Sequence, residues 1–244
     1  MRVSQPFAVL LSCFMLYGCQ SNVSKPVISS PSTTGSVITP PRINLPARAP
    51  AHHSPNLPPS VNYQNWLLQD NHLQQVSSYK QFLLENNIRL PVADEEFFRS
   101  ARNWQACHLE EFSVPQPELW QNMRPTLTLL NTLLAQKIIS DIELTSSYRP
   151  SELNACVGGA KSSSHLSNNA VDFRIGPEQP SLLDQDFIQQ NKLQLCKFWQ
   201  QHGKTFNMGL GVYSTGQIHI DTKGFRTWGV DHTWHSSPCA EIIP

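Results

Sequence analysis

The chain has 244 residues, enough for one or two domains, and 39% of them are hydrophobic. Lys and Arg number 18 and Asp and Glu also number 18, so the formal net charge is zero, which argues against a nucleic-acid binder with its basic surface. No apolar run approaches the roughly 18 residues that cross a bilayer, which excludes a polytopic membrane protein.

The start of the chain predicts an export signal. Arg2 precedes an apolar run over residues 7–17, too short to cross a bilayer but typical of the hydrophobic region of a secretory signal. The run ends in Gly18-Cys19, and residues 1–19 resemble a bacterial lipoprotein signal, in which the cysteine becomes the lipidated first residue of the mature chain. An ordinary secretory signal cut nearby is the alternative, and both interpretations export the chain.

Residues 20–60 are predicted to be a disordered linker. They hold 9 of the 19 prolines and no acidic or aromatic side chain, so they cannot bury a core. All 18 acidic residues and 14 of the 18 basic residues follow residue 60, which gives the folded part a net charge near −4.

Residues 61–139 are predicted to be the helical N-terminal part of the domain. Apolar side chains recur at three- and four-residue spacing over 62–86, which indicates an amphipathic helix or a pair of helices. Asp94 is predicted to cap the start of another helix. Two more helices are predicted to begin at Pro117 and Pro125, because proline is tolerated in a first turn.

Residues 140–244 are predicted to form the core that carries the chemistry. A short strand is expected over 143–148 and a long helix over 181–202. Two more strands, 209–213 and 217–222, are joined by a short turn and predict a hairpin. Helices followed by short strands indicate an α+β fold, with the helices packed on a small antiparallel sheet.

Four cysteines lie in the folded part, and an even number in an exported chain predicts two disulfides. There is no Cys-x-x-Cys, so neither a cysteine zinc site nor a redox motif is expected. Three pairings are possible. We favour Cys107 with Cys156, near the predicted site, and Cys196 with Cys239, which would fix the C-terminal tail to the long helix.

Two histidines and an aspartate have the spacing of a catalytic metal site. His165 lies in a stretch rich in Ser and Asn, and Asp172 lies in an alternating stretch, which indicates a loop ligand followed by a strand ligand. Strict alternation over 217–221 places His219 and Asp221 on one face of a strand. Two His and one Asp leave a fourth zinc position for water. A single histidine is more often a hydrogen-bonding residue, so spacing alone leaves this open.

The same region resembles a known family, the zinc D-alanyl-D-alanine carboxypeptidases and murein endopeptidases, in the branch that ends in His-x-Asp. The resemblance covers residues 140–229. It rests on these motifs in order: Ser147-Tyr148-Arg149-Pro150, Asn154, Val157-Gly158-Gly159-Ala160, Ser163-x-His165, Ala170-x-Asp172, Gly209-Leu210-Gly211-Val212-Tyr213, His219-x-Asp221 and Arg226-Thr227-Trp228-Gly229.

The resemblance implies a fold like that of hedgehog signalling domains, with zinc as the cofactor. It makes His165, Asp172 and His219 the zinc ligands. It also matches Arg149 to the family arginine that contacts the substrate's carbonyl or carboxylate, the alternative being a surface salt bridge.

The sequence departs from the family pattern at two positions. Asn168 stands where the family has glycine, and asparagine is the residue that best tolerates the positive φ that glycine suggests. Gly216 stands where dipeptidase relatives have a glutamate base. Asp221 is then the best candidate for the base, and its alternative role is to orient a ligand imidazole.

Three residues after the last motif histidine leave their roles open. Trp228 could form a wall of the cleft or pack in the core. His232 and His235 are three residues apart, which is only a weak pattern for a second metal site.

The function expected from these features is hydrolysis of D-amino-acid amide bonds in peptidoglycan stem peptides or cross-links. The protein would be a zinc D,D-carboxypeptidase or murein endopeptidase, exported to the periplasmic side and anchored through lipid on Cys19. Peptidoglycan peptides are the expected partners, with no nucleic acid, no membrane contact except the lipid anchor, and a monomeric chain. The alternatives are a non-catalytic zinc domain and a cell-wall-binding lipoprotein with an inactive site.

Overall fold

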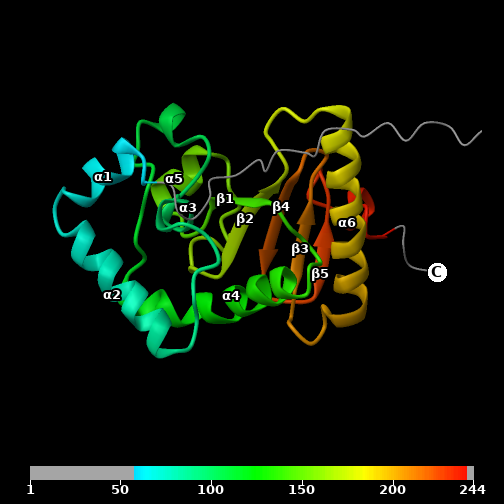
Figure 1. The fold of residues 1–244 in the computed structure, drawn as a ribbon, viewed down its shortest axis with the longest axis horizontal. Helices are drawn as coiled ribbons and strands as arrows, with labels where there is room; N and C mark the ends of the chain where they lie inside the picture. Colours follow the sequence, from blue (N-terminus) through cyan, green and yellow to red (C-terminus); the bar gives the residue numbers. More distant parts are fainter. Residues whose placement is uncertain (1–57, 241–244) are drawn as a thin grey trace, which may run out of the picture. The chain divides into compact units, whose positions relative to one another are not determined.

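Helices and a five-stranded sheet make up residues 58–240, the part of the chain that the computed structural model describes (Figure 1). The predicted signal peptide, the lipidation site Cys19 and the predicted linker up to residue 57 lie outside the described residues. Within the described part, no helix has the length and apolar character needed to cross a membrane.

The amphipathic pattern over 62–86 forms two helices, α1 (Val61–Leu67) and α2 (His72–Glu85), as predicted. Each buries the aromatic side chains of its apolar face. Tyr63 of α1 and Tyr79 of α2 are both almost fully buried, and Tyr79 stacks on Trp120 at 5.1 Å between ring centroids. This N-terminal part therefore shares one hydrophobic core with the rest of the described chain.

The short helix α3 (Asp94–Phe98) begins one residue earlier than the predicted cap implies. Ala93 occupies the N-cap position, and Asp94 is the first helical residue, so the prediction of Asp94 as the cap is wrong. The Asp94 carboxylate pairs with the Lys80 ammonium at 2.5 Å instead of capping the helix. A carboxylate in the first turn still interacts favourably with the helix dipole.

A single helix, α4 (Trp120–Ala135), replaces the two predicted after residue 117. The 3₁₀ turn η2 (Pro117–Leu119) leads into it, and Pro125 lies inside it instead of at its start. Proline in a helix interior costs about 3 kcal/mol. Complete burial of Met123, Leu127 and Leu130 outweighs this cost, because each such side chain contributes roughly 1.5–3 kcal/mol.

The sheet has the strand order β1-β2-β4-β3-β5. The first four strands pair antiparallel, as predicted. The strands are β1 (Ile142–Ser146), β2 (Ala170–Ile175), β4 (Gln217–Asp221), β3 (Gly209–Val212) and β5 (Arg226–Trp228).

Strand β5 was not predicted, and it runs parallel to β3, so the sheet is mixed and the expectation of a purely antiparallel sheet is wrong for this pair. Its three residues are too few to give an alternating pattern. The pairing brings Trp228 opposite Gly211. A Cβ on Gly211 would come within 2.8 Å of the Trp228 indole, so glycine is needed for the tryptophan to lie over β3.

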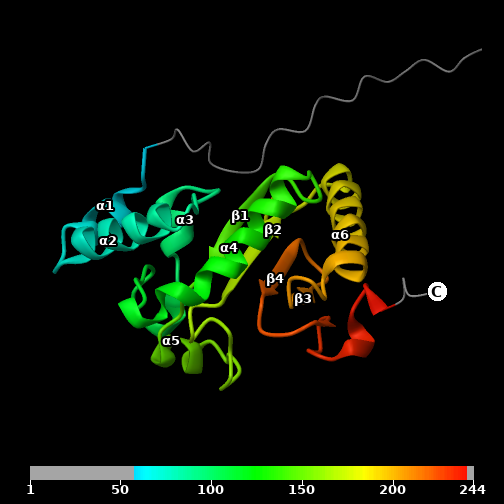
Figure 2. The same cartoon turned by 90° about the horizontal axis from the view of Figure 1, so that it is seen from below.

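Helix α6 (Leu182–His202) matches the predicted long helix. Ser181 caps it in a capping box with Asp184. Its buried Lys192 ammonium donates to the backbone oxygens of Tyr213 and Ser214 at 2.6 and 3.2 Å, which ties the helix to the β3–β4 turn. Figures 1 and 2 show α6 at the β3 side of the sheet and α1 to α3 at the opposite side, with α4 running along β1 and β2.

Both predicted disulfides are present. Cys107, at the end of the 3₁₀ turn η1 (Trp104–Cys107), pairs with Cys156 at the end of helix α5 (Ser151–Cys156). Cys196 of α6 pairs with Cys239, which fixes the C-terminal tail after the 3₁₀ turn η3 (Trp234–Ser236) to that helix.

Removing the Cys196–Cys239 bond should destabilise the protein strongly. The bond closes a loop with a sequence separation of 43, for which the chain-entropy model gives about 4 kcal/mol. The double variant Cys196→Ser/Cys239→Ser should therefore unfold at lower denaturant concentration, with the free energy of unfolding reduced by about that amount. An unchanged unfolding midpoint would show that the bond does not constrain the unfolded chain.

Candidate metal centre

Strand register brings two of the three predicted ligands together. Asp172 on β2 lies directly opposite His219 on β4. Alternation sends Val171, Phe173 and the two isoleucines of β4 into the core, so Asp172 and His219 point to the other face. Directly opposite side chains on one face are close neighbours, and His219 Nδ1 lies 2.8 Å from Asp172 Oδ1.

The third predicted ligand comes from the loop before β2. His165 is 3% exposed, and its backbone oxygen accepts from the backbone N–H groups of Arg149 and Asn168, both at 3.2 Å. Asn168 has a φ of 52°, the conformation that was expected where the family has glycine. Its side chain donates to the Tyr79 hydroxyl and to the Leu119 backbone oxygen, so the helical part of the chain holds this loop in place.

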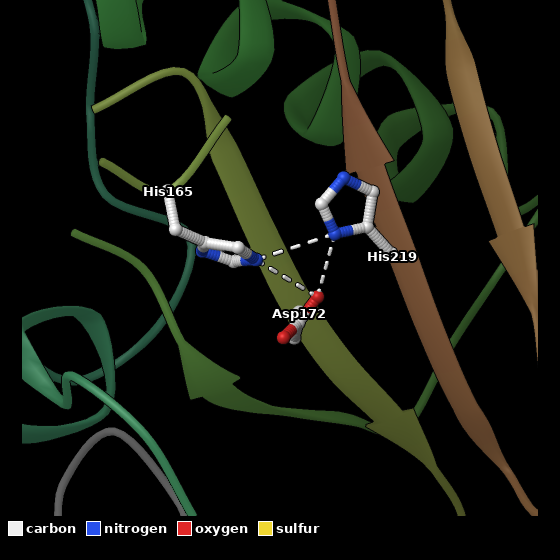
Figure 3. Close-up of side chains that lie close together, drawn as sticks. All are labelled: His165, Asp172 and His219. Atoms are coloured by element: carbon white, nitrogen blue, oxygen red, sulfur yellow. Dashed lines mark hydrogen bonds and ion pairs between the residues drawn. The ribbon is translucent and has the colours of Figure 1, made fainter. Parts of the chain in front are cut away.

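The three predicted ligand atoms form a small triangle (Figure 3). His165 Nε2 lies 3.2 Å from both His219 Nδ1 and Asp172 Oδ1. Zinc bound tetrahedrally by imidazole nitrogen and carboxylate oxygen has ligand atoms roughly 3.3 Å apart. Among the described residues, these three form the group of His, Cys, Asp or Glu side chains close enough to hold a metal ion, and neither His232 nor His235 belongs to it.

The outer nitrogen of each imidazole faces a hydrogen-bond acceptor. His165 Nδ1 lies 2.5 Å from the backbone oxygen of Ser147, and His219 Nε2 lies 3.0 Å from Asp221 Oδ2. A carbonyl and a carboxylate can only accept, so both outer nitrogens carry protons. When a metal ion displaces the proton of the His219 ring, the inner nitrogens of the two neutral rings would present their lone pairs to it beside the Asp172 carboxylate. This donor set fits a cation such as Zn²⁺.

Charges around the triangle differ between the two histidines. Burial lowers the pKa of His165, although Asp172 partly offsets this. Burial also disfavours the charged form of His219, but hydrogen bonds to Asp172 and Asp221 outweigh it and raise the pKa to about 9. Burial alone would raise the pKa of the Asp172 carboxyl, yet the two imidazoles hold it well below its usual range. Asp172 is therefore ionised at neutral pH.

Arg149 lies against the ligand carboxylate. Its Nη2 donates to Asp172 Oδ2 at 3.3 Å and to Ser146 Oγ at 2.9 Å, and its Nε donates to the Ser100 backbone oxygen at 3.3 Å. The side chain is only 11% exposed, so it is not a surface salt bridge.

Asp221 is fully buried behind His219. Its carboxylate accepts from His219 Nε2, from the hydroxyl of Ser164 at 3.2 Å and from the backbone N–H of Lys223 at 2.9 Å. Arg226 adds two more donors, at 2.5 and 3.1 Å. Burial would raise the pKa of the Asp221 carboxyl, but the donors, led by His219, hold it below its usual range. The carboxylate thus contacts the imidazole nitrogen that faces away from the triangle.

Two residues of this arrangement were missed from the sequence. Ser164 is the unspecified residue of the Ser163-x-His165 motif, and Arg226 was named only as part of another motif. Gly209 is the sequence feature that agrees with the contact between Arg226 and Asp221. A Cβ at this position would lie 2.7 Å from both the Arg226 guanidinium and the Asp221 carboxylate.

A cavity of about 600 Å³ opens over the triangle. Its walls include the glycine- and serine-rich loop of residues 158–164 together with Tyr213, which follows β3, Trp228 of β5 and His232, which follows β5. The Trp228 ring lies 5.2 Å from the His219 ring, so this side chain forms a cleft wall. Gln217, by contrast, donates to Thr145 Oγ1 at 2.6 Å and does not line the cavity.

Comparison with known families gives a match over the central part of the chain. The family described as peptidase M15 matches residues 110–221, a range that includes all three predicted ligands together with Arg149 and Asp221. No curated protein matches the chain.

Zinc binding should release about one proton per ion at pH 7. The His219 pKa of about 9 means that the metal-free ring is protonated at pH 7, and the metal needs the lone pair on Nδ1. The apparent zinc affinity should therefore fall as the pH drops below about 9 and level off above it. Titration calorimetry in buffers of different ionisation enthalpy measures the released protons. An affinity independent of pH between 6 and 8 would contradict this prediction.

Proposed function

The chain belongs to the peptidase M15 family, and we propose that it is an exported zinc metallopeptidase that hydrolyses D-amino-acid amide bonds in peptidoglycan stem peptides or cross-links. The family is one of peptidases, so the chain is a hydrolase. The observation that carries the proposal is the triangle of His165, Asp172 and His219 at the floor of an open cavity. A purely structural zinc site is closed by four protein ligands, whereas three ligands leave a position for water or substrate.

In this proposal His165, Asp172 and His219 hold the zinc ion. Bound zinc would polarise the scissile carbonyl and lower the pKa of a water molecule toward neutrality. The Ser147 backbone oxygen keeps the His165 ring in the tautomer that presents Nε2 to the metal.

Asp221 is proposed to position His219 and not to act as the general base. Five donors already contact its carboxylate, and the residue is fully buried although it borders the cavity, so its oxygens have no free lone pair to accept a proton there. Of the two roles considered from the sequence, this geometry supports orientation of the ligand imidazole. Arg226 is proposed to support this positioning of His219 indirectly, because its guanidinium holds the Asp221 carboxylate in place.

Arg149 is proposed to hold the second oxygen of Asp172 and so keep that carboxylate pointing one oxygen at the metal. It also lines the cavity, where its positive charge favours a substrate carbonyl or carboxylate. These two roles are compatible, since a guanidinium has five N–H donors.

The location proposed for the enzyme follows from the sequence features before the domain. A lipid on Cys19 would anchor the chain, and an extended proline-rich linker rises about 3.1 Å per residue. At that rise, residues 20–60 would reach roughly 130 Å from the membrane surface. That reach makes stem peptides and cross-links of the cell wall accessible to a monomeric domain.

His165→Ala should abolish zinc binding and digestion together. Wild-type protein should contain about one zinc per chain and convert isolated muropeptides to smaller products, with mass spectrometry identifying the bond cut. The variant should lack both properties, because two ligands remain. His235→Ala is the matched control, since that histidine is exposed and does not line the cavity. Full zinc content in His165→Ala would refute the site assignment.

Asp221→Asn separates the positioning role from the base role. Loss of a residue that orients a ligand typically lowers metal affinity about 10–100-fold. Turnover of the variant should therefore recover substantially at saturating zinc. A variant that binds zinc with wild-type affinity but has turnover lowered by about 10²–10⁴ would instead identify Asp221 as the base.

A further inference from the structure

Tyr213 enters the cavity from the end of β3, at the start of the turn to β4. Its backbone is held on both sides, because its N–H donates to the Gln217 backbone oxygen at 3.2 Å and its own backbone oxygen accepts from Lys192 Nζ. The side chain lines the same cavity as the three proposed zinc ligands. The backbone of Tyr213 is therefore fixed, and its phenol group contributes to the wall of the cavity that also contains the three proposed zinc ligands.

Among the described residues, the hydroxyl of Tyr213 has one hydrogen-bond partner. Trp228 Nε1 lies 3.1 Å from the phenol oxygen. An indole N–H can only donate, so the tyrosine oxygen is the acceptor and its own proton must point elsewhere. Within residues 58–240 no acceptor contacts that proton, and the ring's other neighbour is His232, at 6.0 Å between ring centroids. The cavity thus contains an O–H donor with no acceptor among the described residues.

The position of this donor is tied to the proposed metal centre. The Trp228 indole lies over Gly211, which pairs with His219, and the Trp228 and His219 rings are 5.2 Å apart. Burial raises the pKa of Tyr213, the hydrogen bond from Trp228 offsets part of this, and the nearby Asp172 carboxylate raises it again, against smaller opposing effects of Arg102 and Arg149. The hydroxyl consequently keeps its proton at neutral pH.

Most N–H groups of the other strong donors near the triangle are already engaged. Arg149 contacts Ser100, Ser146, Asp172 and Asn154 through its three nitrogens. Arg226 contacts both oxygens of Asp221. The uncommitted phenol is accordingly the better placed of these groups to meet new negative charge in the cavity.

We propose that Tyr213 is a catalytic residue that donates a hydrogen bond to the scissile carbonyl oxygen as it becomes an oxyanion; this rests on the proposed peptidase function. When water adds to the carbonyl carbon, the C=O π electron pair moves onto the oxygen, and the Tyr213 O–H donates to it without transferring its proton. When the C–N bond breaks, the electron pair returns to form the carboxyl group. The departing amine takes up the proton lost by the water.

Tyr213→Phe tests this role, because it removes the hydroxyl and keeps the ring. Loss of one oxyanion donor typically lowers kcat about 10²–10³-fold. The substrates are a disaccharide pentapeptide ending in D-Ala-D-Ala and a cross-linked muropeptide dimer. We expect that loss in kcat, a KM changed less than about threefold, and unchanged zinc content. Tyr63→Phe is the matched control, since its buried hydroxyl has no hydrogen-bond partner among the described residues and Tyr63 does not line the cavity.

A tetrahedral inhibitor supplies a readout independent of turnover. A phosphinate analogue of the scissile dipeptide places a charged oxygen where the oxyanion forms. Its dissociation constant, measured by calorimetry, should rise in Tyr213→Phe by about the factor lost in kcat/KM. Trp228→Phe keeps the Tyr213 hydroxyl but removes the group that directs it, so it should give a smaller loss in kcat of the same kind.

Several outcomes would overturn the proposal. Unchanged kcat in both Tyr213→Phe and Trp228→Phe would show that the hydroxyl does not meet the oxyanion. A loss confined to KM, with phosphinate affinity unchanged, would make Tyr213 a ground-state binding residue. Wild-type protein that binds zinc but cleaves neither substrate would refute the proposed peptidase function itself, which is a different result from an active wild type with an equally active variant.

Discussion

The structure depends on one electrostatic constraint: two imidazole nitrogens and a carboxylate oxygen are held within 3.2 Å of one another. Lone pairs at this separation repel unless a cation or a proton lies among them. The fold opposes this repulsion with a hydrogen bond to each group on the side that faces away from the other two. The Ser147 backbone oxygen fixes one ring, the Asp221 carboxylate fixes the other, and Arg149 fixes Asp172.

The helical N-terminal part of the domain also helps to hold the three ligand groups close together, through hydrogen bonds to the segments that carry them. Ser147 donates through its backbone N–H to Arg99 and through its hydroxyl to Phe97, and the Ser146 hydroxyl donates to the Ser100 backbone oxygen at 2.6 Å. Asn168 anchors the ligand loop to Tyr79. Residues outside the recognised motifs thereby position the segments that carry His165 and Arg149, which gives residues 61–139 a role in the site.

Local patterns in the sequence predicted most of this arrangement. Strict alternation placed His219 on the non-core face of its strand, and the serine- and asparagine-rich stretch correctly placed His165 in a loop. The α+β fold, both disulfides and the positive φ of Asn168 were also predicted correctly. The features that could not be predicted depend on contacts between distant segments. Helix α4 continues through Pro125 because burial of its apolar side chains outweighs the cost of the proline. Strand β5 forms by pairing with β3, and its three residues are too few to show a pattern in the sequence. The environment of Asp221 belongs to the same class, since Ser164 and Arg226 meet it only after folding.

The lone pairs of His165, His219 and Asp172 are expected to converge on one zinc ion. Anomalous diffraction from crystals of the zinc-loaded protein, recorded on either side of the zinc absorption edge, locates that ion. We expect one strong peak about 2.0–2.2 Å from His165 Nε2, His219 Nδ1 and Asp172 Oδ1. A zinc peak elsewhere, for example on His232 or His235, or no peak within bonding distance of all three atoms, would contradict it.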